Sequence, residues 1–152
     1  MKTKRIIAIA IMVLSILLLA SQAVSALTLP DSEYDKISWT WQYSAPATSS
    51  YNCLGYATGS MTWEWPSSWG DGATKAQVDS YMASLGYRDY IYDAFILAYG
   101  PDVNYITHFS KVTGTSWCRA KWGQLERFNH ASYDPYYHTS LYGALQIKYT
   151  AN

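Results

Sequence analysis

The sequence is poor in charged residues, and the few that it has are balanced. Charged residues make up 14% of the 152 positions, acidic and basic side chains number 11 each, and no basic run follows Arg5. Nucleic-acid binding depends on clustered Lys and Arg that neutralise phosphates. The composition therefore argues against a nucleic-acid partner.

Residues that bind metals are also scarce, with three His and two Cys in the whole chain. Neither a paired-Cys nor a His-x-x-x-His spacing occurs, and no glycine-rich phosphate loop is present. We therefore expect neither a metal ion nor a cofactor. The two cysteines, Cys53 and Cys118, can instead join in one disulfide outside the cytoplasm, and this bridge is the main alternative to a free thiol.

The first 26 residues have the order of a cleavable signal peptide. Lys2, Lys4 and Arg5 precede an apolar run over 6–20, and small residues lead to Ala26. A spanning helix needs roughly 20 apolar residues, so this run is short for a membrane anchor, which stays the alternative. We expect cleavage after Ala26, a secreted (extracellular) protein with no stable membrane insertion, and one domain over 27–152.

Two helices are predicted near the start of this domain. Small and apolar residues recur at helical spacing from Cys53, and Thr74 is followed three residues later by Gln77, which forms a capping box before an apolar face that ends at Gly86. Between them, Pro and Gly in 61–72 predict a loop.

The second half of the chain reads as strands separated by turns. Strand-like runs cover 94–99, 105–112, 116–122 and 142–149, and the alternation of Trp39, Trp41 and Tyr43 allows one brief strand earlier. Helices that precede a run of strands predict an α+β fold with a mostly antiparallel sheet.

Cys53 is the candidate nucleophile, because the start of a helix and a neighbouring imidazole both stabilise a thiolate. His108 lies within a predicted strand, and a strand residue that faces the helix can act as its base. A third group that orients the imidazole is expected after the next strand. His130 is the first choice, and the alternatives are Asn129, Asp134, His138 and Asn104.

Donors for an oxyanion are expected at the same helix start. The backbone amide of Cys53 is the first, and the second is left open among Asn52, Gln42, Tyr43 and Tyr51. The loop over 61–72, with Trp63 and Trp65, is expected to form one wall of a cleft.

The segment Asn52-Cys53-Leu54-Gly55-Tyr56-Ala57 resembles the Asn-Cys-x-x-Tyr/Trp-Ala nucleophile segment of small papain-like domains, which are related in plan to NlpC-type and CHAP cell-wall amidases and peptidases. Short later matches, Thr107-His108, Lys121, Gly123, His130 and Tyr142-Gly143, extend the resemblance over roughly 39–149.

This resemblance implies a papain-like core whose N-terminal helices pack on the sheet. It implies hydrolysis of an amide or peptide bond through a Cys53 thioester, with His108 as base, His130 as orienting group, and a peptide or peptidoglycan-like substrate. The sequence departs from the pattern at Cys118, where a small polar residue is expected, and in lacking the Asp-Cys start of NlpC-type enzymes.

The fifteen Tyr and seven Trp support a second hypothesis. Tyr and Trp side chains pack in strands and in protein cores, but a group of them exposed on the surface can also bind glycan or protein. A catalytically silent secreted binding module is therefore the alternative to the hydrolase. Its sign would be a Cys53 that is buried or bridged to Cys118, together with aromatics clustered in an exposed patch, whereas the hydrolase requires a reduced, partly exposed Cys53 close to His108.

Overall fold

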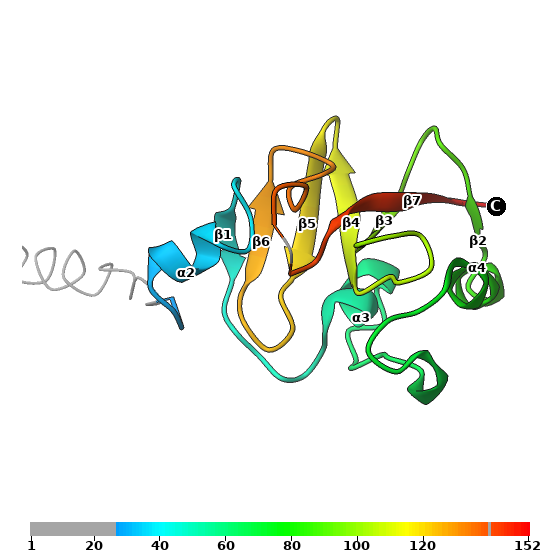
Figure 1. Cartoon of the computed structure of the whole chain (residues 1–152), viewed down its shortest axis with the longest axis horizontal. Coiled ribbons are helices and arrows are strands. Elements are labelled where there is room, and N and C mark those ends of the chain that lie inside the picture. The colour runs from blue at the N-terminus through cyan, green and yellow to red at the C-terminus, as the bar shows by residue number, and fades with distance from the viewer. Residues whose placement is uncertain (1–26, 140) are drawn as a thin grey trace, which may run out of the picture.

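The structure is a computed structural model, and it describes residues 27–139 and 141–152. The predicted signal peptide, 1–26, lies outside the described residues. Seven strands form one sheet in the order β1-β6-β5-β4-β3-β7-β2, and all neighbours are antiparallel (Figure 1). The strands are β1 (Gln42–Ala45), β2 (Tyr87–Asp89), β3 (Ile96–Gly100), β4 (His108–Gly114), β5 (Trp117–Lys121), β6 (Arg127–His130) and β7 (Ala144–Ala151).

Few helices accompany this sheet. They are α2 (Asp31–Asp35), α3 (Cys53–Thr58), α4 (Lys75–Ser84) and a single 3₁₀ turn, η1 (Ser67–Trp69). Figure 1 shows α2 beside β1 at one end of the sheet and α4 beside β2 at the other, with α3 near β4. The predicted mixture of helices and a mostly antiparallel sheet is confirmed at this coarse level.

Local capping explains why both predicted helices form. The side chain of Asn52 accepts a hydrogen bond from the Gly55 N–H at 3.0 Å and so begins α3. Gly59, in the left-handed region at φ 88°, ends that helix. The capping box predicted at Thr74 is present, with Gln77 accepting from the Thr74 N–H at 2.8 Å.

The brief early strand allowed by the alternation of Trp39, Trp41 and Tyr43 corresponds to β1, which begins at Gln42, precedes α3 and pairs with β6 at the edge of the sheet. The predictions miss α2, β2 and β6, which are short elements of three to five residues. Such elements owe their order to distant partners, because one or two turns of helix or a few strand residues are unstable alone.

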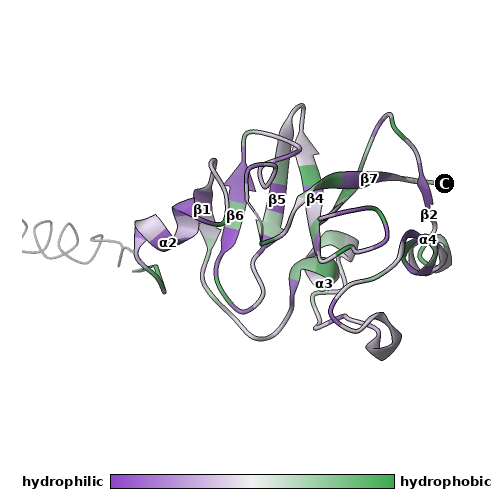
Figure 2. Cartoon of the chain, in the orientation of Figure 1, coloured by the Kyte–Doolittle hydropathy of each residue, from purple (hydrophilic) through white to green (hydrophobic). Residues whose placement is uncertain are grey.

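Each face of the sheet carries its own core. Along β3, Ile96 and Ala98 belong to a cluster with α3 and α4, whereas Leu97 and Tyr99 belong to a second cluster on the opposite face. Figure 2 shows that α3 is hydrophobic along most of its length, while α2 is mainly hydrophilic. Both faces are thus buried over the central strands, and α3 is held against β4 by its apolar side.

No helix in the described part of the chain is long and apolar enough to cross a bilayer.

Candidate functional site

A pocket of about 360 Å³ opens where α3 and β4 begin. Cys53 comes from the first residue of α3 and His108 from the first residue of β4. The predicted nucleophile and the predicted base therefore line the same pocket. The remaining lining residues are Asn52, Trp63, Trp65, Gly70, Asp71, Thr107, Gly123 and Tyr142.

Asn52 fixes the helix start against the loop that follows α3. Its amide nitrogen donates to the backbone oxygen of Glu64 at 2.7 Å, and its side-chain oxygen also accepts from the Glu64 N–H at 3.3 Å. Close approach of this loop requires a glycine at position 55, since a Cβ there would lie 1.8 Å from the Thr62 oxygen. Asn52 thus lines the pocket, but its amide group is engaged by Glu64 instead of pointing to an oxyanion.

Cys53 is buried, with 6% of the residue exposed, which is one of the signs expected of the binding module. Burial raises the pKa of Cys53 to about 11, and the backbone N–H groups of Phe109 and Leu54 and the charge of Lys121 oppose this rise. Burial therefore acts against the thiolate that a helix start and a neighbouring imidazole favour. The group rests as a neutral thiol and needs a base before it can attack.

No disulfide joins the two cysteines, which are both free and buried. Cys53 belongs to the core cluster beneath α3, and Cys118 belongs to the cluster on the opposite face of the sheet. The Cys118 thiol donates to the backbone oxygen of Ser132 at 3.1 Å. Their placement on opposite faces explains why the bridge considered from the sequence does not form.

We expected His108 to face α3, but it does not. It pairs with Tyr99 across β3 and β4, so its side chain shares the face of Tyr99, while the next residue, Phe109, packs in the cluster beneath α3. It reaches the pocket because it is the first residue of its strand. Its ring stacks on Tyr142, with centroids 3.7 Å apart and an interplanar angle of 12°.

The imidazole of His108 is almost fully enclosed, with 1% of the residue exposed. Its Nε2 atom lies 3.2 Å from the hydroxyl oxygen of Tyr136. Burial, and then the neighbouring His130, hold the pKa of His108 well below its usual value. At neutral pH the ring is an uncharged base, and its Nδ1 atom is not the one that contacts Tyr136.

His130, the predicted third group, contacts His108 through another side chain. Its Nε2 atom lies 3.2 Å from the Tyr136 hydroxyl, and its Nδ1 atom contacts the backbone oxygen of Thr40. Burial lowers the pKa of His130 to about 4, while the Thr40 carbonyl works in the opposite direction. His130 is fully buried and lies outside the pocket lining.

Tyr136 is the member of this site that sequence reasoning missed. It is fully buried and receives a hydrogen bond of 2.9 Å from the indole N–H of Trp122. Among fifteen tyrosines, nothing in its local pattern marks it out, although it lies just after the turn at Asp134 and Pro135. Only the packing of this turn on the sheet reveals its position between the two histidines.

A buried lysine lies on the other side of the thiol. Lys121 is fully buried, its ammonium donates to the backbone oxygen of Gly123 at 2.6 Å and to that of Leu125, and it lies 5.6 Å from the centre of the Tyr51 ring. Burial lowers the pKa of Lys121 to about 8. It anchors the turn at Gly123 that forms one edge of the pocket.

The structure separates the remaining predicted residues. Trp63 and Trp65 line the pocket, as expected of a cleft wall, and 49% of Trp63 is exposed. Gln42 is exposed on β1, and Tyr51 is buried against Lys121, so neither lines the pocket.

The other candidates for the third group have different roles or positions. Asn129 accepts from Arg119 at 2.5 Å, and Asp134 accepts from the Leu145 N–H at 2.8 Å. His138 and Asn104 are both exposed.

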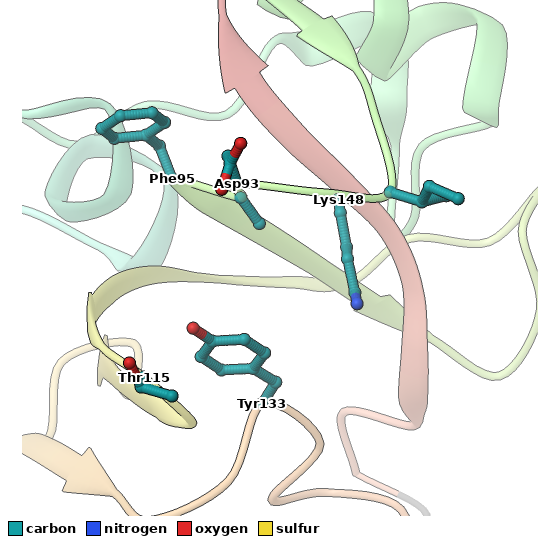
Figure 3. Close-up of a pocket in the computed structure, with 7 residues that line it drawn as sticks. Asp93, Phe95, Thr115, Tyr133 and Lys148 are labelled. Atoms are coloured by element: carbon teal, nitrogen blue, oxygen red, sulfur yellow. The ribbon is translucent and has the colours of Figure 1, made fainter.

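A second pocket, of about 340 Å³, lies away from these residues (Figure 3). The Lys148 side chain extends from β7 towards Tyr133, with Thr115 and Phe95 at its rim. Tyr133 uses its hydroxyl to donate to the backbone oxygen of Gly114 at 2.9 Å. This second pocket contains no thiol or imidazole, so the chemistry of the site belongs to the first.

Across residues 27–139 and 141–152, no group of three or more His, Cys, Asp or Glu is placed to hold a metal ion. The thiol of Cys53, the imidazole of His108 and the carboxylate of Asp71 line the pocket, and the Lys121 ammonium lies outside its lining.

The fold and the pocket together define an α+β domain with a buried thiol and imidazole at the start of β4, the central strand of an antiparallel sheet. Residues 42–150 match DUF7689, a domain of unknown function, and the chain belongs to this family. The match covers β1 to β7 and thus every residue of the pocket. Comparison with curated proteins and with solved structures finds no match.

Proposed function

We propose that this domain is a thiol hydrolase that cleaves an amide or peptide bond through a thioester on Cys53. The observation that carries the proposal is the shared pocket, lined by Cys53 from α3 and by His108 from β4. A helix that bears the nucleophile and packs on an antiparallel sheet that bears the base agrees with a papain-like plan. The papain-like relationship is part of the proposal.

The protonation states define what general-base catalysis must achieve here, because burial disfavours both the thiolate and the imidazolium that proton transfer creates. Cys53, with a pKa raised by burial, holds its proton, and His108, with a lowered pKa, has a vacant nitrogen. As the sulfur forms a bond to the substrate carbonyl carbon, its proton passes to Nδ1 of His108. The imidazolium then gives that proton to the leaving amine as the carbon–nitrogen bond breaks. Water then attacks the thioester carbon and gives a proton to His108; the carbon–sulfur bond breaks, the carboxylic acid product leaves, and the proton returns to the sulfur of Cys53.

Hydrogen-bond donors and one positive charge near the sulfur stabilise the negative charge that develops on it during this reaction. The backbone N–H groups of Phe109 and Leu54 and the ammonium of Lys121 all favour the thiolate. These groups are fixed by the sheet, by the helix start and by the carbonyls of Gly123 and Leu125. Preorganised donors of this kind act most strongly where water is excluded.

The size of the pocket limits the part of a substrate that it can hold. Its volume of about 360 Å³ holds a few residues or a small acyl group, and Trp63 and Trp65 offer apolar walls on one side. A peptide of the cell-wall peptidoglycan kind has the required amide bonds, and secretion through the predicted signal peptide would bring the protein to it. Both statements belong to the proposal.

Acylation by 4-nitrophenyl acetate tests the proposal without knowledge of the natural substrate. We expect release of nitrophenolate and an acetyl group on Cys53, located by mass spectrometry of the digested protein. Cys53→Ala and His108→Ala should abolish both signals. Cys118→Ser is the matched control, because it removes the other buried thiol and leaves the pocket intact.

Two results would count against a hydrolase. One is acetylation of Cys53 that is equally fast without the imidazole of His108. The other is no acetylation at all in the folded protein. If Cys53 is inert but the protein retains glycan or peptide on its Trp63 and Trp65 wall, the binding module is the better description.

A further inference from the structure

Tyr136 lies at the centre of a buried chain of hydrogen bonds that runs from the backbone at Thr40 to His108. We propose that this chain fixes His108 in the tautomer with hydrogen on Nε2 and a bare Nδ1, so that Tyr136 and His130 act as positioning residues for the base. The functional meaning of this chain rests on the proposed role of His108. The chain itself can be tested without activity.

The chain begins at His130. The Thr40 carbonyl can only accept, so the Nδ1 atom that contacts it must carry a hydrogen. Ser38 lies 3.3 Å from the same Nδ1 atom, but its single hydroxyl hydrogen is directed to the backbone oxygens of Thr40 and Pro135, at 2.8 and 3.1 Å. Ser38 therefore cannot donate to His130. A neutral His130 then has a bare Nε2 atom.

Tyr136 continues the chain with one donor and two acceptor positions. The indole N–H of Trp122 can only donate, so it occupies one acceptor position at 2.9 Å. The bare Nε2 atom of His130, 3.2 Å away, takes the single hydroxyl hydrogen. One acceptor position is left on the Tyr136 oxygen.

His108 completes the chain. Its Nε2 atom, 3.2 Å from the Tyr136 oxygen, finds only an acceptor there and must carry the hydrogen. A neutral ring with hydrogen on Nε2 has a lone pair on Nδ1, which is the form that can remove the Cys53 proton. The side chains of His130, Tyr136, Trp122 and His108 are 0–1% exposed, so water does not compete for the bonds that join them.

The tautomer can be read directly by two-bond ¹H–¹⁵N correlation spectra of the imidazole rings at neutral pH. We expect His108 to show a protonated Nε2 and a bare Nδ1, with the signals assigned by their loss in His108→Gln. A wild-type His108 with hydrogen on Nδ1 overturns the inference. This outcome does not depend on whether Cys53 is acylated, so it is distinct from failure of the proposed hydrolase.

Tyr136→Phe breaks the chain and keeps the ring that packs against His108. We expect a mixture of tautomers at His108 and an alkylation rate of Cys53 with iodoacetamide that falls in proportion to the share of His108 that leaves the Nε2–H form, about twofold for an equal mixture. Tyr137→Phe is the matched control, since Tyr137 is the next residue and 63% exposed. Tyr137→Phe should change neither the tautomer of His108 nor the alkylation rate of Cys53.

The far end of the chain gives a second pair of variants. His130→Gln keeps an acceptor for the Tyr136 hydroxyl, whereas His130→Leu removes it. We expect Gln to retain the Nε2–H form of His108 and Leu to lose it. Folded Tyr136→Phe and His130→Leu proteins with an unchanged tautomer and an unchanged alkylation rate would overturn the inference. If either variant fails to fold, the wild-type spectrum still decides.

Discussion

Acid should destabilise this protein chiefly through its buried histidines. Burial lowers the pKa of His130 from 6.5 to about 4, and the ring is fully buried beside Tyr136 and Trp122. At about 1.36 kcal/mol for each pH unit, a difference of this size corresponds to roughly 3 kcal/mol of folding free energy. A typical domain has only about 5–15 kcal/mol in total.

The direction follows from which state binds the proton. Between pH 6.5 and 4 the unfolded chain protonates His130 and the folded protein does not. The contribution of His130 to the free energy of unfolding is therefore complete above pH 6.5. It is lost as the pH falls towards 4, and the loss reaches roughly 2.5 kcal/mol by pH 4.5. His108 acts in the same direction, because its pKa is also lowered.

Urea unfolding followed by tryptophan fluorescence at several pH values measures this loss. His130→Gln should unfold at lower urea at pH 7, but its free energy of unfolding should change less between pH 7 and 4.5, by roughly the 2.5 kcal/mol assigned to His130. Glu64 and Glu126, whose pKa values lie below the ordinary 4.5, contribute mainly at more acidic pH. The exposed His138 gives the control His138→Gln. Equal pH dependence in the wild type and His130→Gln would refute the reasoning.

Two further predictions concern the groups that hold the pocket. Gly55→Ala should destabilise the protein by about 3 kcal/mol or more in urea unfolding, because the added Cβ would meet the backbone oxygen of Thr62. Gly114→Ala is the control and should change stability little, because its added Cβ would lie 3.9 Å from the nearest neighbour. A clear loss in the second variant and none in the first would contradict the packing described for α3. Lys121→Met should lower the free energy of unfolding by about 1–3 kcal/mol, because the backbone oxygens that Lys121 contacts lose their donor. The same variant should slow alkylation of Cys53 at fixed pH, because loss of the ammonium raises the thiol pKa further. An unchanged alkylation rate in the folded variant would show that the ammonium does not act on the sulfur.

Local signals in the sequence were sufficient to predict the helices that begin at a capping residue and the longer strands that turn residues separate. The helix at Cys53 follows from small residues after an Asn that can cap, and α4 follows from Thr74 and Gln77. The four longer predicted strands correspond to β3, β4, β5 and β7, with shifts at their ends. Turn residues and apolar runs set these elements within a few positions of the chain.

The candidate site could be predicted only as a set of residue types. The sequence paired Cys53 with His108 and included His130, and the structure places the first two at one pocket. Which face His108 occupies depends on its register opposite Tyr99, and this register is set by strands that lie far apart in the chain. The same is true of Tyr136, which reaches the histidines from a turn.

The sequence by itself determined the class of elements, the absence of clustered charge and the choice of Cys53 and His108, because these depend on composition and on neighbours a few residues apart. The tertiary structure alone decided three further features: the neutral state of the thiol, the separation of Cys53 from Cys118, and the hydrogen-bond chain through Tyr136. Each of these depends on burial or on a partner from a distant strand. Desolvation and hydrogen-bond geometry arise only when such strands meet.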